Sequence, residues 1–499
     1  MKLSVKTINR VARKYSKKAH RAFLHKQYDT CIEYLKAASH TRYNFYMGFR
    51  DEEYEKLLFS LSRVVRQVDR PVVSQPNECV FFDSFSIDSG GLVQQYLAAI
   101  IFAGYKVHYI TERKGFLSHK SAIRTQLEEG GVKDIIEVPS KLSGMARAQF
   151  IYDVIVNSGA SKLFMQTNPS AVCPIVAFLA LPSNIIRYKI NLTDHAFWIG
   201  ASCIDYSLEF RPRGCVLSEY ARGVSHEKIF LLPFYPIVNS TPFGGFPKET
   251  DGKILILSGG AFYKVYDEND TFFKLAQGIL EHNQNAVILF AGEGDRQRMY
   301  EKLQTYSIEK RFILIGQRKD IAEVFKHIDI YLDTFPLGGG LMCQLAAFFS
   351  KPILAYSELG SASVEEYVCQ THHTEIAKNS IESVIAESCR LVQDVDYRQK
   401  VGKQINSCVV DSEKFNGLFF KTMESSTNQV PYTEKEEWKE NPARICDKIL
   451  YENKEKQYQR SIVKIFGFSA LWKCPGFLLD SIGIAIRNNR VLSVIKNNI

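Results

Sequence analysis

Glycine pairs and one lysine follow apolar segments in the C-terminal half of the sequence, at positions where they could bind phosphate. Adjacent glycines at the end of a strand leave backbone N–H groups uncovered, and a helix that follows presents its positive end to the same point. The alternative is a tight turn that lets a helix pack closely, and the residues alone leave both interpretations open. The residues concerned are Gly259, Gly260, Lys264, Gly338, Gly339 and Gly340.

The segments around these residues predict a parallel sheet. Ile328 to Thr334 reads as a strand, Leu341 to Phe349 as an uncharged helix, and Pro352 starts a second short strand. Strand, glycine loop, helix and strand make up the repeating unit of such a sheet. Three upstream strands also end in glycine-containing or basic loops, on the edge where open α/β sheets bind ligands. These segments are ILILSGGAFYKVYDEND, AVILFAGEGDRQRMYEKL and RFILIGQRKDIAEVF.

This order of segments resembles the donor domain of GT-B glycosyltransferases, and most closely that of the O-GlcNAc transferase family and its bacterial protein-glucosylating relatives. The resemblance runs from Lys253 to Ile405. SGGAFYKV is similar to the family's strand and loop that carry a diphosphate-binding lysine, which implies this role for Lys264. GQRKDIAEVFKHIDIYLDTFP resembles the segment that contacts the base, which implies a base contact for Arg318.

The helix after the glycine loop departs from the family pattern. Leu345 stands where the family has a ribose-binding acid, and Leu341 and Met342 replace its threonines. The family's ribose contacts are therefore not carried over, which leaves the identity of the donor open. We count Gln344, the polar residue beside Leu345, as a candidate donor-site residue, together with Asp333, which closes the strand before the loop.

A second candidate site lies in the segment NLTDHAFWIGASCIDYSLEF of the N-terminal half. Asp194 and His195 follow a predicted strand there, at the edge that should face the other domain. Because histidine titrates near neutral pH and a carboxylate can orient it, His195 is a candidate general base with Asp194 behind it. A hydrogen-bonded structural histidine is the alternative. The segment resembles the family's acceptor-side loop, whose DY pair is Asp205-Tyr206 here, without matching a catalytic-histidine motif.

The 499-residue chain is too long for one ordinary core, and we predict an α/β protein with two Rossmann-like domains in the GT-B arrangement. A helical extension over residues 1–75 precedes an acceptor domain over 76–247. A donor domain over 248–420 and a helical tail over 421–499 follow. No apolar run is long enough to span a membrane, and the eleven cysteines are scattered without CxxC pairs, as in reduced cytoplasmic proteins.

Both ends of the chain are basic, and the net charge is +9. No acid precedes Asp29, while apolar residues of the first helix repeat at intervals of three and four. Such a helix can pack on the protein or lie on an anionic membrane, and the apolar, basic C-terminal tail allows the same two interpretations. We expect a cytoplasmic protein, attached peripherally to the inner face of a membrane if the second interpretation holds. The apolar stripe is Ile8, Val11, Ala12, Tyr15, Ala19 and Ala22.

The sequence gives little support to metal-dependent chemistry. Asp394 to Asp396 has the DxD pattern of metal-binding glycosyltransferases, but it opens a predicted helix in which Asp396 would serve as the N-cap. Gly90-Gly91 lacks the GxGxxG pattern, which argues against a dinucleotide site. HExxH, GxSxG and P-loop motifs are absent. We therefore expect no metal ligands.

The resemblance and these residues together predict a metal-independent glycosyltransferase for hexosyl or N-acetylhexosaminyl transfer. It would need no cofactor beyond a nucleotide-sugar donor, for which a UDP-sugar is the first candidate. The acceptor would be a protein, a glycan or a glycolipid, as in polysaccharide biosynthesis, and no nucleic-acid partner is expected. The alternatives are a nucleotide-sugar epimerase and a non-catalytic GT-B module that supports a partner glycosyltransferase, which Leu345 favours.

Overall fold

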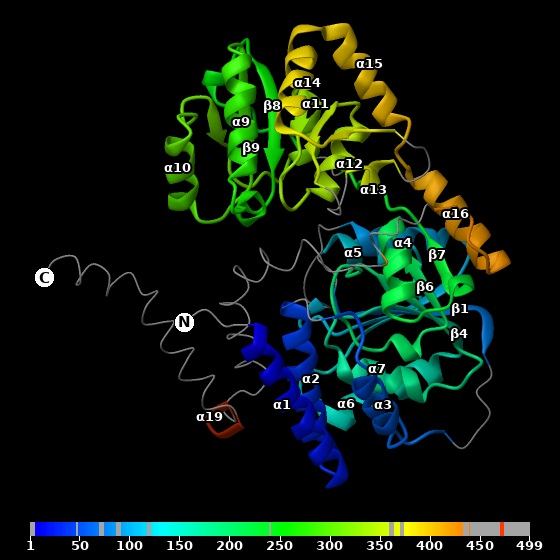
Figure 1. Cartoon of the computed structure of the whole chain (residues 1–499). Helices are drawn as coiled ribbons and strands as arrows, with labels where there is room; N and C mark the ends of the chain where they lie inside the picture. Colours follow the sequence, from blue (N-terminus) through cyan, green and yellow to red (C-terminus); the bar gives the residue numbers. More distant parts are fainter. Residues whose placement is uncertain are drawn as a thin grey trace, which may run out of the picture.

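The computed structural model contains two parallel α/β domains, one above the other in Figure 1. The first domain is drawn in blue to green and lies below the second, which is drawn in green to gold. The structure describes residues 5–45, 48–68, 74–85, 91–116, 121–238, 241–358, 364–369, 374–432, 439 and 470–473.

Three helices precede the first sheet: α1 (Val5–Leu24), α2 (Tyr28–Asn44) and α3 (Glu52–Ser62). α1 and α2 pack against each other, and Tyr15 stacks on Tyr34 with 6.2 Å between the ring centroids. Ala12, Tyr15, Ala19 and Ala22 of the predicted apolar stripe are buried. This face of α1 therefore packs on the protein, while its basic face remains exposed.

The first domain has a seven-stranded parallel sheet with the order β3-β2-β1-β4-β5-β6-β7. Its strands are β1 (Gln75–Asp83), β2 (Lys106–Thr111), β3 (Asp134–Glu137), β4 (Ala160–Gln166), β5 (Ile186–Asn191), β6 (Tyr206–Glu209) and β7 (Ile229–Leu231). The helices within this part of the chain are α4 (Leu92–Phe102), α5 (Ala122–Glu129), α6 (Gly144–Ser158), α7 (Val172–Ala180) and α8 (Pro212–Val216).

Both faces of this sheet are covered, as expected for a parallel sheet with apolar residues on both sides of each strand. Val80 and Phe82 of β1 point into a core shared with α1, α2, α3, α6 and α7. Cys79 and Phe81 point into the opposite core, against α4 and α5. The helical extension is thus an integral part of the first domain's core.

The second domain has a six-stranded parallel sheet with the order β10-β9-β8-β11-β12-β13. Its strands are β8 (Ile254–Gly259), β9 (Ala286–Ala291), β10 (Phe312–Leu314), β11 (Ile330–Leu332), β12 (Ile353–Tyr356) and β13 (Ala377–Lys378). Its helices are α9 (Thr271–His282), α10 (Arg296–Thr305), α11 (Ile321–His327), α12 (Gly340–Phe348), α13 (Glu365–Val368), α14 (Ile381–Gln393) and α15 (Val395–Asn406).

The strand order of the second sheet reverses direction between β8 and β11, which are neighbours. Open α/β sheets bind their ligands beside such a switch point, at the carboxyl ends of the strands. The two predicted glycine loops follow these two strands. The topology therefore brings Gly259-Gly260 and Gly338–Gly340 to one place, although nearly eighty residues separate them in the sequence.

The last long helix, α16 (Ser412–Ser425), leaves the second domain and packs against α4 of the first, as Figure 1 shows in orange. Phe415 meets Tyr96 edge-on at 5.4 Å between ring centroids, and Phe419 lies 6.3 Å from the same ring. Both phenylalanines are fully buried. Up to residue 432, the chain therefore crosses between the domains twice, once before β8 and once before α16.

One sequence-based prediction about a helix start is wrong. Asp394, rather than Asp396, is the N-cap of α15, because its carboxylate accepts a hydrogen bond from the backbone N–H of Tyr397. Asp394 has the extended backbone conformation that an N-cap requires. Asp396 instead lies in the first turn of the helix.

Most of the predicted C-terminal tail (421–499) lies outside the described residues, which include only 421–432, 439 and the short helix α19 (Ala470–Lys473) of this segment. Within the described ranges, no helix is long and apolar enough to cross a membrane. The nine cysteines in these ranges are free, and most of them are buried.

Candidate active site

Lys264 and the glycine loop after β11 are in contact at the switch point. Lys264 lies on a short turn of 3₁₀ helix (Phe262–Val265) just beyond β8. Its Nζ donates a hydrogen bond to the backbone oxygen of Gly338 at 3.3 Å, and Leu337 N–H donates to the Lys264 backbone oxygen at the same distance. An ammonium group and a turn of exposed backbone therefore lie side by side, which is an arrangement suited to a diphosphate.

The turn after β8 requires glycine for two separate reasons. Gly260 has φ +137°, a backbone conformation that a residue with a side chain rarely adopts. Its carbonyl oxygen also lies only 1.9 Å from the position a Cβ would take on Gly292, at the end of β9. The loops after β8 and β9 thus touch through their backbones.

Unusual backbone angles do not explain the glycines of the loop Gly338–Gly340, because none of the three has a positive φ. Close packing explains the glycines instead, because a Cβ on Gly339 would lie 2.8 Å from Tyr331 Oη and one on Gly340 would lie 2.9 Å from the Tyr367 ring. The turn is closed by Asp333, whose Oδ1 accepts the backbone N–H of Gly339 at 2.8 Å.

Asp333 therefore organises the loop from the inside. Its Oδ1 also accepts the N–H of Thr334 at 2.9 Å. Burial raises the pKa of the Asp333 carboxyl, although Lys264 and these backbone N–H groups oppose the shift. The loop thus combines one ammonium with one nearby carboxylate.

In the first domain, His195 and Asp194 follow β5 as predicted, and they are hydrogen-bonded to each other. The His195 Nδ1 lies 3.3 Å from Asp194 Oδ1, and the histidine side chain is 34% exposed whereas that of Asp194 is fully buried. An accessible imidazole with a buried carboxylate behind it is the arrangement of an oriented general base. The structure thus combines the two residues in the way that the hypothesis requires.

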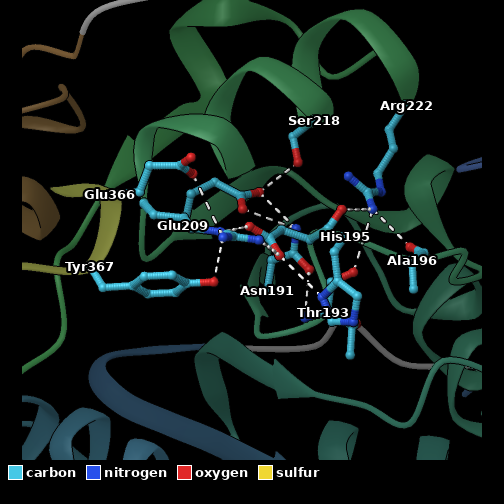
Figure 2. A network of polar contacts seen from close by, with 11 residues as sticks. Asn191, Thr193, His195, Ala196, Glu209, Ser218, Arg222, Glu366 and Tyr367 are labelled. Atoms are coloured by element: carbon cyan, nitrogen blue, oxygen red, sulfur yellow. Dashed lines mark hydrogen bonds and ion pairs between the residues drawn. The ribbon is translucent and has the colours of Figure 1, made fainter. Parts of the chain in front are cut away.

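Arg211 is the main partner of Asp194. It follows β6 directly, and its guanidinium forms two hydrogen bonds to the Asp194 carboxylate, at 2.5 Å and 2.9 Å (Figure 2 shows the surrounding residues). Burial alone would raise the pKa of Asp194, but Arg211 and His195 together hold it well below its usual range. Asp194 is therefore ionised at neutral pH and presents a fixed negative charge to the imidazole.

The backbone of this acceptor-side loop, residues 192–203, is held by side chains from other elements. Arg222 is fully buried, and its Nη2 donates to the carbonyl oxygens of Asp194 at 2.6 Å and Ala196 at 2.9 Å (Figure 2). At the far end, Glu55 of α3 accepts the backbone N–H groups of Gly200 at 2.8 Å and Ser202 at 3.0 Å. The loop is thus fixed at both ends although it contains little regular structure.

A second buried carboxylate, Glu209, lies beside this loop at the end of β6. It accepts hydrogen bonds from Asn191 at 3.0 Å and from Ser218 at 2.6 Å (Figure 2), and a third from Ser207 at 2.6 Å. Burial raises the pKa of Glu209 to about 7, against the effect of these hydrogen bonds. Gly214 has no side chain because a Cβ there would lie 2.6 Å from Glu209. The floor of the acceptor-side loop therefore contains a carboxyl group that titrates near neutral pH.

The acceptor-side loop and the donor-side loop face each other across the domain boundary. Ala196, next to His195, is buried against Leu337, which precedes Gly338, and against Tyr43 of α2. The residues predicted from two distant parts of the sequence thus line one shared region. Tyr43 adds a contribution from the helical extension.

Two predicted donor-site residues have contacts with the connection between the domains. Arg318 donates to Asp320 Oδ1 at 2.7 Å and to the backbone oxygen of Gly245 at 2.9 Å. Gln344 is buried, and its amide donates to the backbone oxygens of Phe234 at 2.8 Å and Tyr367 at 3.1 Å. Their proposed contacts with base and ribose stay predictions, while both side chains stabilise the interdomain connection.

Sequence reasoning missed the groups that hold the acceptor-side loop, namely Glu55, Arg211 and Arg222. A signal was available for Arg211, because it follows an apolar strand directly and precedes Pro212 at a helix start, as a residue at the ligand edge should. Tyr367 was also missed, since its role depends on a contact made across the domain boundary. Among the residues that the structure describes, no group of three or more potential metal ligands occurs.

Comparison with known structures agrees with this geometry. No protein-family model and no curated protein matches the sequence. A mutant of the Thermobaculum terrenum O-GlcNAc transferase superimposes with a TM-score of 0.50 at 14% identity, over 90% of this chain and 82% of that one. Anabaena Alr3699/HepE in complex with UDP gives a TM-score of 0.50 at 10% identity, over 70% of this chain and all of that one. This chain is similar to both in fold, and it has the GT-B fold that was predicted.

We expect Glu55→Ala to lower the free energy of unfolding by about 1–3 kcal/mol, because it leaves the buried N–H group of Gly200 without its acceptor and also removes the bond to the Ser202 N–H. Urea denaturation measures the change. The exposed Glu53, on the same helix, provides the control, since Glu53→Ala should change the free energy by no more than about 0.5 kcal/mol. Equal effects of the two substitutions would show that Glu55 does not fix the loop.

Proposed function

We propose that the protein is a metal-independent glycosyltransferase that uses a nucleotide-activated sugar, with a UDP-sugar as the first candidate. The observation that carries the proposal is the meeting of Lys264 and the glycine loop of one domain with the His195 loop of the other. Such a junction would hold an anionic leaving group on one side and an acceptor on the other.

The proposed donor side works through electrostatics. Lys264 and the backbone N–H groups near Gly338 would bind the diphosphate and stabilise the negative charge that grows on it as the glycosidic bond breaks. Fixed positive groups of this kind need no reorganisation during the reaction. Support for UDP comes from the similar fold of Anabaena HepE, whose structure is a complex with UDP.

The proposed acceptor side works through general base catalysis. His195 would take the proton from the attacking group of the acceptor, while ionised Asp194 orients the ring and stabilises the imidazolium. A protein, a glycan and a glycolipid each offer a suitable group. The arrangement therefore supports a reaction class without selecting the acceptor.

One observation favours a second function, that of a non-catalytic module which supports a partner glycosyltransferase. Leu345, at the position where the resembling family has its ribose-binding acid, is buried in the core of the second domain. Release of free nucleotide from a nucleotide-sugar by the purified protein would decide between enzyme and module. Product analysis would separate transfer from epimerisation.

We expect a UDP-sugar, in a thermal-shift comparison with GDP-, CMP- and dTDP-sugars, to stabilise the protein by about 2.7 kcal/mol at a hundred times its Kd. Lys264→Ala should then lower kcat by about 10²–10³-fold, because it removes a preorganised positive group. The exposed Lys274 on α9 gives the matched control, and Lys274→Ala should leave kcat unchanged. If all four nucleotide-sugars fail to shift the melting temperature, the proposed function is wrong.

His195→Ala should lower the rate of transfer by about 10²–10⁴-fold with little change in nucleotide affinity, because the base acts on the acceptor. Steady-state kinetics and calorimetric titration with UDP measure the two quantities. His25, which is exposed near the end of α1, supplies a control substitution to alanine. A variant that loses folding and binding together would identify His195 as a structural residue.

We further propose that the exposed face of α1 attaches the protein to an anionic membrane surface at the inner face of the cell membrane. Cationic side chains recur on this face through successive turns, and α1 contains no acid. Each basic side chain near an anionic leaflet contributes about 1 kcal/mol, so a few are enough for reversible attachment. The exposed cations are Arg10, Arg13, Lys14, Lys17 and Arg21.

Liposome co-sedimentation tests the attachment. We expect binding to vesicles with anionic lipid, loss of binding to zwitterionic vesicles, and weakening by salt. Replacing Arg13, Lys14 and Lys17 together by glutamate should abolish the binding. The same change of charge at the exposed Lys248, Lys274 and Lys310 of the second domain should have a much smaller effect. Equal losses in both triple variants would refute a docking role for α1.

A further inference from the structure

The side chain of Arg211 joins the acceptor-side loop to the second domain. It is only 3% exposed. While Nε and Nη2 hold Asp194, its Nη1 donates to the Tyr367 hydroxyl at 2.6 Å and lies 3.6 Å from the Glu366 carboxylate (Figure 2). The planar guanidinium thus serves both domains at the same time, which the point charge of a lysine could not do.

Tyr367 in turn is fixed to the donor side. Its ring covers Gly340, the first residue of α12, so closely that a Cβ on this glycine would lie 2.9 Å from a ring carbon. Its backbone oxygen accepts a hydrogen bond from Gln344, one turn further along α12. Tyr367 therefore cannot shift without disturbing the end of the glycine loop.

These contacts form a continuous chain of five groups. Gly340 packs on the Tyr367 ring, the Tyr367 hydroxyl accepts from Arg211, Arg211 holds Asp194, and Asp194 holds the His195 ring. Each link is a direct contact. The two middle links are hydrogen bonds from the buried guanidinium of Arg211, which has few other acceptors within reach. A displacement at the glycine loop would thus be transmitted to the imidazole.

We propose that Arg211 is a positioning residue that couples the donor loop to the acceptor-side loop, so that binding of the nucleotide-sugar sets the orientation of His195. The inference rests on the proposed function, to which it adds a physical connection between the donor side and the acceptor side of the site. Arg211 touches neither substrate in this scheme and acts through Asp194. The link to Tyr367 is the part that a purely structural ion pair with Asp194 would not need.

Tyr367→Phe tests this link selectively, because it removes the hydroxyl and keeps the ring that packs on Gly340 and lies against Phe210. Hydrogen–deuterium exchange of residues 192–203 is measured with and without UDP. We expect UDP to slow exchange in the wild-type loop, and we expect the slowing to disappear in Tyr367→Phe although UDP affinity changes by less than about threefold. Arg211→Lys should behave in the same way, whereas Tyr300→Phe on the exposed face of α10 should match wild type.

Steady-state kinetics supply a second readout. Tyr367→Phe should lower kcat roughly 10- to 100-fold, as expected for a lost hydrogen bond to a charged group, and should change KM for the donor little. If Tyr367 acts through His195, the same substitution in a His195→Ala background should have less than about a twofold further effect. Additive effects would overturn the coupling.

The outcomes separate this inference from the proposed function. A wild-type protein that binds no nucleotide refutes both. A wild-type protein that binds UDP and turns over the donor, while Tyr367→Phe retains normal exchange behaviour and normal kcat, refutes the coupling and leaves the proposed function standing.

Discussion

The buried ion pair between Arg211 and Asp194 is the interaction on which the rest of the candidate site depends. Removing two charges from water is costly, and the attraction between them offsets this cost only if both partners are present and their other hydrogen-bonding groups are satisfied. Here the Nη1 group of Arg211 donates to the Tyr367 hydroxyl, and the carboxylate of Asp194 is also hydrogen-bonded to the His195 ring. The pair thus determines where two domains and one histidine lie, rather than contributing only to stability.

The acceptor-side loop, which carries Asp194, has little secondary structure of its own, so its backbone polar groups need partners from elsewhere. Arg222 and Glu55 provide them, one from beyond β6 and the other from the helical extension. A loop of this kind can present a side chain accurately only when such external contacts replace the missing helix or strand hydrogen bonds. The extension is therefore part of the machinery that shapes the acceptor side, in addition to covering the sheet.

The sequence predicted the elements whose signals are local. Strands that end in glycine are recognisable one at a time, and parallel topology then brings Lys264 to Gly338 without further information. What the glycines do was harder to predict, because the reason for Gly340 is the ring of Tyr367, which follows much later in the chain. In a sequence, a glycine required by close packing looks the same as one required by a positive φ.

The contacts of Arg318 and Gln344 show the same limit. Both were assigned to the donor site from their position along the chain, yet Arg318 donates to Gly245 in the connection between the domains and Gln344 donates to Phe234 of the first domain. A single sequence indicates which edge of a sheet a residue occupies, but it does not indicate which neighbour receives its hydrogen bonds. In a two-domain protein those neighbours are decided by how the domains meet.

The return of α16 to the first domain has a mechanical consequence. Two domains joined by one segment can rotate relative to each other about any axis, whereas two connecting segments restrict the rotation to the axis that passes through both. The segment after β7 and the segment before α16 are two such connections, and the hydrogen bond from Gln344 to Phe234 strengthens the first. Opening and closing would then follow a single arc, on which Arg211 meets Tyr367 in the same orientation at each closure. Lengthening one of the two connections would remove this restriction, because a domain held at one point can rotate about any axis.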